Sequence, residues 1–191
     1  HYVEEDSQES FTQVLKGDAR HSDILRTKEY ASGLPDQFRV LDLVDGIAAN
    51  HSQNVGMQLL SEGDLKGARH ALRLALAFDP EHPTIFSNLA VVSSLLGKES
   101  ESVELCRYAL ELYDDHPQAN FLFARLLAKS GDAKEAAEHL RRILSDTRPL
   151  WNAPHLVHDA KRMLKYAKHP RVLQAYAVKQ IAQEKLAFIE D

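Results

Sequence analysis

Histidine is the residue with the clearest capacity for chemistry in this chain, since ten imidazoles are present and a neutral imidazole is a common metal ligand. His155 and His158 stand three residues apart, so on a helix they would share a face and could chelate one ion. Asp159 is the only adjacent carboxylate, and no cysteine lies nearby. A donor set this small is poor for a structural metal. We therefore expect no metal site and no cofactor.

Cys106 is the only cysteine and the second candidate for chemistry. It lies thirty-four residues after Leu72 and thirty-four before Leu140, in a series of positions that helices would bury. A buried cysteine behaves as a small hydrophobic residue with an unreactive thiol. The chain carries no G-x-S-x-G, P-loop or G-x-G-x-x-G motif, and no two carboxylates stand out as an acid and base pair. We expect that the protein is not an enzyme.

Composition restricts the class of protein further. With 191 residues the chain can form one domain or a short repeat array, and 44% apolar with 27% charged residues is typical of a soluble folded protein. The net charge of -5 indicates no general affinity for nucleic acid, and no apolar run approaches the roughly 18 residues of a membrane helix. We expect a soluble, cytoplasmic protein. Because the sequence begins at His1 rather than Met, a periplasmic or secreted location stays open.

Three glycines indicate how the chain is organised. Gly63, Gly97 and Gly131 recur every thirty-four residues, and a small residue follows each of them after five positions. Glycine tolerates the positive φ of a tight helix exit, and a small residue lets two helices approach closely. Prolines, which end helices, lie between successive glycines and also after the last one: Pro80, Pro83, Pro117 and Pro149. The spacing therefore predicts a repeated helix–turn–helix unit.

This pattern resembles the tetratricopeptide repeat, a helix–turn–helix unit of about thirty-four residues. With repeats numbered from Ala49, Pro83 and Pro117, the family's small positions 8 and 20 hold Gly56, Ala90, Ala124, Ala68, Ser102 and Ala136. The chain departs from the family at position 4, often tryptophan, which holds Ser52, Phe86 and Asn120. The resemblance implies an all-α, right-handed α-solenoid.

The resemblance covers residues 49–150, as three repeats over residues 49–82, 83–116 and 117–150. Before them we expect an acidic, partly disordered leader over residues 1–34 and an N-terminal packing helix over residues 35–48. After them the period lapses, and we expect C-terminal capping helices over residues 151–191. These helices could instead dock a second copy of the protein, so a homo-oligomer stays open.

In this family the first helices of the repeats line a concave groove that binds a peptide, so the resemblance implies a groove here. Its lining positions hold Asn50, Gln53, Asn54, Met57, Ser87, Asn88, Val91, Phe121, Arg125 and Lys129. Asn54 and Asn88 share position 6, where an amide can both donate to and accept from the backbone of an extended peptide. Leu122 takes this position in the third repeat.

Chaperone-binding members of the family hold a C-terminal carboxylate with a clamp of lysine and arginine residues. The corresponding places here hold Gln53, Met57, Asn88, Gln118 and Leu122, of which only Asn88 fits. Without cations, nothing offsets the desolvation of a carboxylate. We predict that this protein does not bind chaperone tails in that manner.

Basic residues are concentrated late in the chain. Residues 139–171 carry eight bases against two acids, a net charge of +6, whereas residues 1–50 carry ten acids against five bases. The basic patch comprises Arg141, Arg142, Lys161, Arg162, Lys165 and Lys168. It could attract an acidic partner, but the absence of interleaved aromatic residues disfavours nucleic acid.

Together these features favour a scaffold, adaptor or assembly factor that binds a peptide segment of a protein partner in its groove. One alternative is a non-catalytic repeat domain of a larger enzyme or of a secretion or assembly component. A minor alternative is polyanion or nucleic-acid binding through the basic patch, which predicts retention that weakens with salt.

Overall fold

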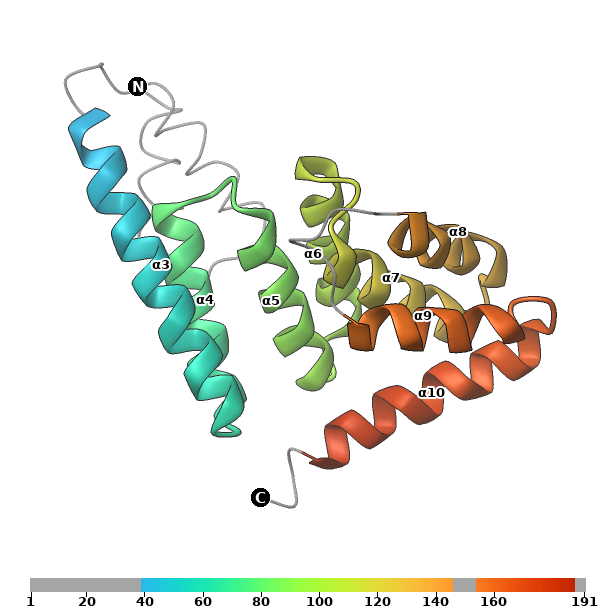
Figure 1. Ribbon diagram of the computed structural model, residues 1–191. Helices are drawn as coiled ribbons and strands as arrows, with labels where there is room; N and C mark the ends of the chain where they lie inside the picture. Colours follow the sequence, from blue (N-terminus) through green and yellow to red (C-terminus); the bar gives the residue numbers. More distant parts are fainter. Residues whose placement is uncertain (1–38, 146–153, 188–191) are drawn as a thin grey trace, which may run out of the picture. The chain divides into compact units, whose positions relative to one another are not determined.

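The computed structural model describes residues 39–145 and 154–187 (Figure 1). These residues form eight α-helices and no strand: α3 (Arg39–Ser61), α4 (Leu65–Phe78), α5 (Pro83–Leu95), α6 (Glu99–Leu112), α7 (Pro117–Ser130), α8 (Ala133–Ser145), α9 (Pro154–Tyr166) and α10 (Pro170–Ala187). Within the two parts of the chain, consecutive helices pack on one another as in an α-solenoid, α3 on α4 and each of α6 to α9 on the next, which confirms the predicted all-α class. None of these helices is long and apolar enough to cross a membrane. The predicted leader over residues 1–34 lies outside the described residues.

The chain forms two compact units, an N-terminal unit that ends at Val92 and a C-terminal unit that begins at Ser93. α3, α4 and most of α5 belong to the N-terminal unit, while the end of α5 and α6 to α10 belong to the C-terminal unit. The boundary between the units lies within the second predicted repeat, and each unit is described by itself below.

The N-terminal unit begins with one long helix where the sequence analysis predicts two. α3 runs without a break for 23 residues through the expected junction at Ala48 and Ala49. The physical reason is that this junction holds no proline and two good helix formers, so nothing there interrupts the backbone hydrogen bonds. The expected packing helix and the first helix of repeat one are therefore one element.

α3 and α4 pack closely because small residues lie where they cross. A Cβ atom added to Gly56 on α3 would lie only 2.8 Å from Cγ of Leu72 on α4. Ala68, one turn before Leu72, is fully buried, as is Leu72 itself. The small residues at the family's positions 8 and 20 thus serve close helix approach, as expected from the sequence.

The three glycines end their helices with the same hydrogen bonds. φ is +82° at Gly63, +78° at Gly97 and +100° at Gly131. Each glycine N–H donates to the carbonyl three residues before it, and the next N–H donates five residues back, as from Asp64 to Leu59. This is the Schellman arrangement, which satisfies carbonyls that a helix end would otherwise leave without partners. The glycine turns predicted from the sequence are confirmed.

The residue after each glycine begins the next helix, and here the repeats differ. The carboxylate of Asp64 accepts from the N–H of Gly67 at 2.9 Å, and that of Asp132 accepts from Glu135 at 3.1 Å. Lys98 occupies the same place in the middle repeat and makes no side-chain capping bond. The start of α6 therefore lacks a stabilising contact that α4 and α8 both have.

The C-terminal unit is built around α7. Ten of the 14 residues of α7 are buried, so the helix is covered on nearly all sides. Its neighbours are α6, α8 and α10, and α9 packs mainly on α8. The core cluster of this unit contains Phe121, Ala124, Ala128, Ala133, Ala136, Leu140, Ile143, Ala160, Met163, Leu173 and Ala177.

Candidate functional site

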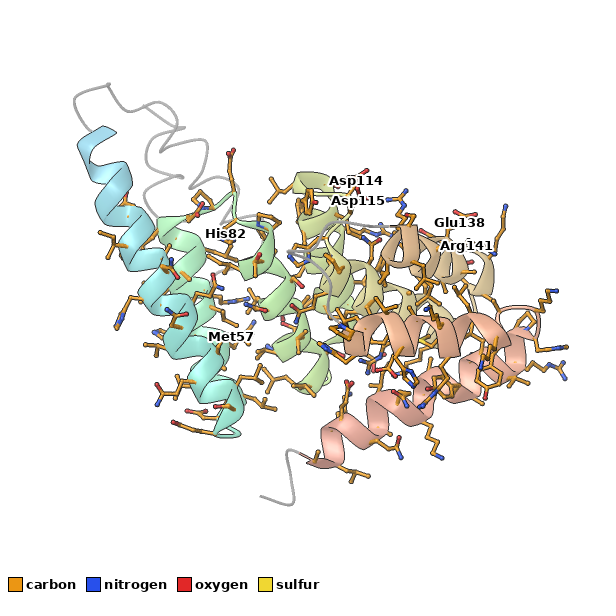
Figure 2. The ribbon with its side chains drawn as sticks, in the orientation of Figure 1. Met57, His82, Asp114, Asp115, Glu138 and Arg141 are labelled. Atoms are coloured by element: carbon orange, nitrogen blue, oxygen red, sulfur yellow. The ribbon has the colours of Figure 1, made fainter. Side chains whose placement is uncertain are left out.

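The clearest open face among the predicted groove residues lies on α3. The predicted residues Asn50, Asn54 and Met57, together with Ile47, which was not predicted, recur every three or four residues, so they share one face of the helix. All four are exposed, with 64% of Ile47 and 37% of Met57 accessible. The opposite face, with Ala49, packs inward. Figure 2 labels Met57 on this helix. We call these four residues the α3 face.

The predicted groove residues on α5 are placed differently. Ser87 is fully buried, Asn88 is 4% exposed, and Val91 is half-buried. The two asparagines that share position 6 are therefore not equivalent, because Asn54 is exposed and Asn88 is not. Only Asn54 can reach a ligand without a rearrangement of the chain. Gln53, beside it on α3, is half-buried.

The predicted groove residues on α7 are covered by α10. Arg125 is 5% exposed, and its guanidinium donates twice to the carboxylate of Glu184, from Nη1 to Oε1 at 2.8 Å and from Nη2 to Oε2 at 2.5 Å. The same guanidinium lies 5.5 Å from the ring centre of Phe121, which is also buried. A two-point pairing of this kind fixes both the distance and the orientation of the two helices.

Lys129, one turn after Arg125, contacts both α6 and α10. Its ammonium group donates to Glu99 on α6, and Lys185 of α10 lies 3.8 Å from the same carboxylate. Gln174, near the start of α10, donates from its amide to the backbone carbonyl of Lys129 at 2.9 Å. The three predicted residues Phe121, Arg125 and Lys129 thus contact their own chain.

The partners of the α7 residues, Glu184, Gln174 and Glu99, were not predicted from the sequence. One signal was available, because Glu184 is the only acidic residue in α10 and lies on the same side as the apolar residues Leu173, Ala177 and Ile181. That signal says that α10 has an apolar face with one carboxylate. It does not say which helix the face covers.

A shallow hollow of about 550 Å³ lies on the other side of α7, against α6. Its lining comprises Glu99, Ser100, Val103, Glu104, Arg107, Leu126, Leu127, Lys129 and Ser130. Arg107 at its edge lies 5.8 Å from the ring centre of Phe123. Acidic, basic and apolar groups are mixed in this hollow, so its chemistry selects no one class of ligand.

The side chains considered for chemistry in the sequence lie in different environments. Cys106 is buried, and burial raises the pKa of its thiol, so the thiol stays protonated. His158 and His155 are both exposed, and Nη2 of Arg162 lies 3.0 Å from Nε2 of His158. No group of three or more His, Cys, Asp or Glu side chains in the described ranges is arranged to hold a metal ion.

A buried polar cluster joins α7 to its neighbours. The amide of Asn120 donates to the carbonyls of Asp114 and His116 at 2.8 and 3.0 Å, and its Oδ1 lies 2.7 Å from Nδ1 of His139 on α8. His116 in turn accepts from the N–H of Ala119 and so caps α7. Burial lowers the pKa of His139, with a smaller effect of the Arg142 charge in the same direction, opposed by Glu138. Since the amide of Asn120 is fully hydrogen-bonded, the cluster serves the fold.

The basic patch is exposed throughout. Arg141 and Arg142 lie on α8, Lys161, Arg162 and Lys165 on α9, and Lys168 just after it. None of them forms an ion pair with a carboxylate of the described residues. Figure 2 labels Arg141 beside Glu138 on α8. The patch is therefore a set of exposed cations, of which Arg162 also contacts His158.

Comparison with known proteins supports the helical repeat over part of the chain. No family model matches the chain. A segment of 63 residues, 33% of this chain, is 35% identical to tetratricopeptide repeat protein 8 of Caenorhabditis elegans. The matched segment covers 12% of the length of that relative. The similarity supports a tetratricopeptide-like helical repeat, in agreement with the all-helical fold.

Proposed function

We propose that this protein is a non-catalytic interaction scaffold that binds a segment of a protein partner on the α3 face. The observation that carries the proposal is the exposure of Ile47, Asn50, Asn54 and Met57 on α3, which contains the first helix of the first predicted repeat. This is the helix to which the family resemblance assigns ligand binding. The similarity to a tetratricopeptide repeat protein supports the same class of function.

The α3 face combines two kinds of contact that peptide recognition requires. Ile47 and Met57 can bury apolar area against a partner, and full burial of such a side chain contributes about 1.5–3 kcal/mol. Asn50 and Asn54 can each donate and accept, so they can pair with the backbone of an extended segment whatever its side chains. Orientation would thus come from the amides and affinity from the two apolar residues.

The direct test is affinity capture of partners with the full chain and a double variant, Asn54→Ala with Met57→Ala. Both side chains are exposed, so the substitutions leave the core intact. The matched control is Lys66→Ala with His70→Ala, two exposed residues one turn apart on α4. We expect partners retained by the wild type and the control to be lost by the α3 double variant. Equal capture by all three proteins would refute the α3 face as the binding site.

A second candidate function is binding of an acidic partner by the basic patch. It is favoured by the exposure of all six cations and by their lack of carboxylate partners in the described part of the chain. Electrostatic binding of this kind weakens steeply as salt rises. Retention on heparin that is lost in Lys161→Glu with Lys165→Glu would support it, and no retention by the wild type at low salt would exclude it.

The similarity covers a small part of the known relative, so a role inside a larger assembly is a further proposal. The chain would then be a repeat domain of a larger enzyme or of a secretion or assembly component. In either case the binding surface that we propose is the same. The capture experiment above therefore tests the surface, whichever protein carries it.

A further inference from the structure

α10 covers the part of α7 to which the family resemblance assigns ligand binding. Its inward face carries Leu173, Ala177 and Ile181, spaced by four residues, and all three are buried. Leu173 and Ala177 belong to the same core cluster as Phe121 of α7. Glu184 follows three residues after Ile181 and pairs with Arg125. α10 therefore has the features of a bound amphipathic helix with one carboxylate anchor.

Few residues attach α10 to this unit, as is also true of α9. Only three of its 18 residues are buried, against ten of 14 in α7. Its outer face leaves Val172, Val178 and Leu186 exposed at 48%, 43% and 53%. Elements with few buried apolar contacts open at lower cost than the rest of a domain.

The polar contacts that hold α10 are accessible from solvent on one side. The side chain of Arg125 is 6% exposed, but that of Glu184 is 49% exposed. α10 forms a second ion pair, between its Lys185 and Glu99 of α6, and both of these side chains are also partly exposed. A competing carboxylate can therefore reach Arg125 as α10 departs, without first unfolding α7.

We propose that α10 is an internal ligand of α7, and that a partner helix with the same pattern displaces it. The pattern is three apolar residues at positions i, i+4 and i+8 and a carboxylate at i+11, matching Leu173, Ala177, Ile181 and Glu184. This inference rests on the proposed function as an interaction scaffold. It adds a second binding surface, of stated chemistry, which the chain itself keeps closed.

Hydrogen exchange of the full chain tests whether α10 opens independently. Glu184→Gln removes the charge that pairs with Arg125, and Lys179→Gln, an exposed site on the same helix, is the control. We expect amide exchange in α10 to rise about tenfold in Glu184→Gln, because charge-assisted hydrogen bonds are lost, with α8 and α9 unchanged. An equal rise throughout α7 to α10, or no rise in α10, would overturn the proposal.

A labelled peptide of residues 169–187 tests the binding surface itself. The Glu184→Gln chain should bind this peptide at least about tenfold tighter than the wild type, whose own α10 occupies the site. An Arg125→Glu chain should instead prefer a peptide that carries Glu184→Arg, since the charges are then exchanged. Failure of both chains to bind, or binding without these preferences, would overturn the proposal. These outcomes do not involve the α3 face, so they are distinguishable from failure of the proposed function.

Discussion

Arg125 on α7 and Glu184 on α10 form a two-point ion pair although 59 residues separate them in the sequence. The pair is asymmetric, because the arginine side chain is 6% exposed and the glutamate side chain 49%. This asymmetry matters for stability. A buried charge that loses its partner stays without water, whereas a half-exposed charge can be rehydrated.

We therefore predict unequal costs for removing the two partners. Glu184→Leu leaves the buried guanidinium without an anion and should lower the free energy of unfolding by about 2–3 kcal/mol. Arg125→Leu leaves Glu184 half in water and should cost about 1 kcal/mol less. Urea unfolding of both single variants measures the difference. A larger loss for Arg125→Leu than for Glu184→Leu would contradict the burial asymmetry.

Gly63 and Gly46 make a matched pair for testing the turns. Apart from the adjoining backbone, neither site has an atom within 4 Å of an added Cβ, so an alanine meets no other part of the chain at either position. Gly63 has φ of +82°, whereas Gly46 lies within α3. Gly63→Ala should destabilise the protein by about 1 kcal/mol, and Gly46→Ala should stabilise it by about 0.5–1 kcal/mol. Thermal unfolding of the two variants would show opposite shifts, and shifts of the same sign would contradict this reading of Gly63.

Lys98 is a position where a missing helix cap can be supplied. Asp64 and Asp132 accept an N–H bond at the equivalent place, and Lys98 does not. Lys98→Asn should supply the missing cap and raise stability by about 1 kcal/mol. Its loss of the ion pair with Glu101, at 3.9 Å between partly exposed groups, should matter little. Asp132→Ala is the comparison, and it should lower the free energy of unfolding by about 1 kcal/mol. An unchanged melting temperature in Lys98→Asn would refute the prediction.

His139 should make stability depend on pH. Its pKa is lowered from the ordinary 6.5, chiefly by burial, so the unfolded chain takes up the proton first as pH falls. The contribution of His139 is therefore fully present above about pH 6.5 and is lost as pH falls through the lowered pKa. His139→Gln should remove this part of the pH dependence. Parallel stability curves for wild type and His139→Gln between pH 7.5 and about pH 5 would contradict it.

The helical repeat could be predicted from the sequence because its signals are local. Gly63, Gly97 and Gly131 each determine a turn through their own φ, and the small residues five positions later lie within the same helix pair. Such signals act over a few residues, so a single sequence is enough to find them. The absence of a helix break at Ala49 was missed, because the repeat register suggested a boundary that the helix formers there do not support.

The accessibility of the predicted groove could not be predicted in the same way. Asn54 and Asn88 occupy the same repeat position, yet one is exposed and one is buried. Arg125 occupies a groove position of the repeat, but its guanidinium is paired with Glu184, which lies far along the chain. Burial of this kind depends on which distant helix packs on a surface, and periodicity within one repeat carries no information about that choice.

Site-specific photo-crosslinking can show whether a partner binds on the α3 face. A photoreactive amino acid would replace Asn54 on the α3 face in one protein and His70 on the exposed side of α4 in another. We predict a crosslink to the captured partner from position 54 and none from position 70. A crosslink from position 70 with none from position 54 would contradict the proposed site.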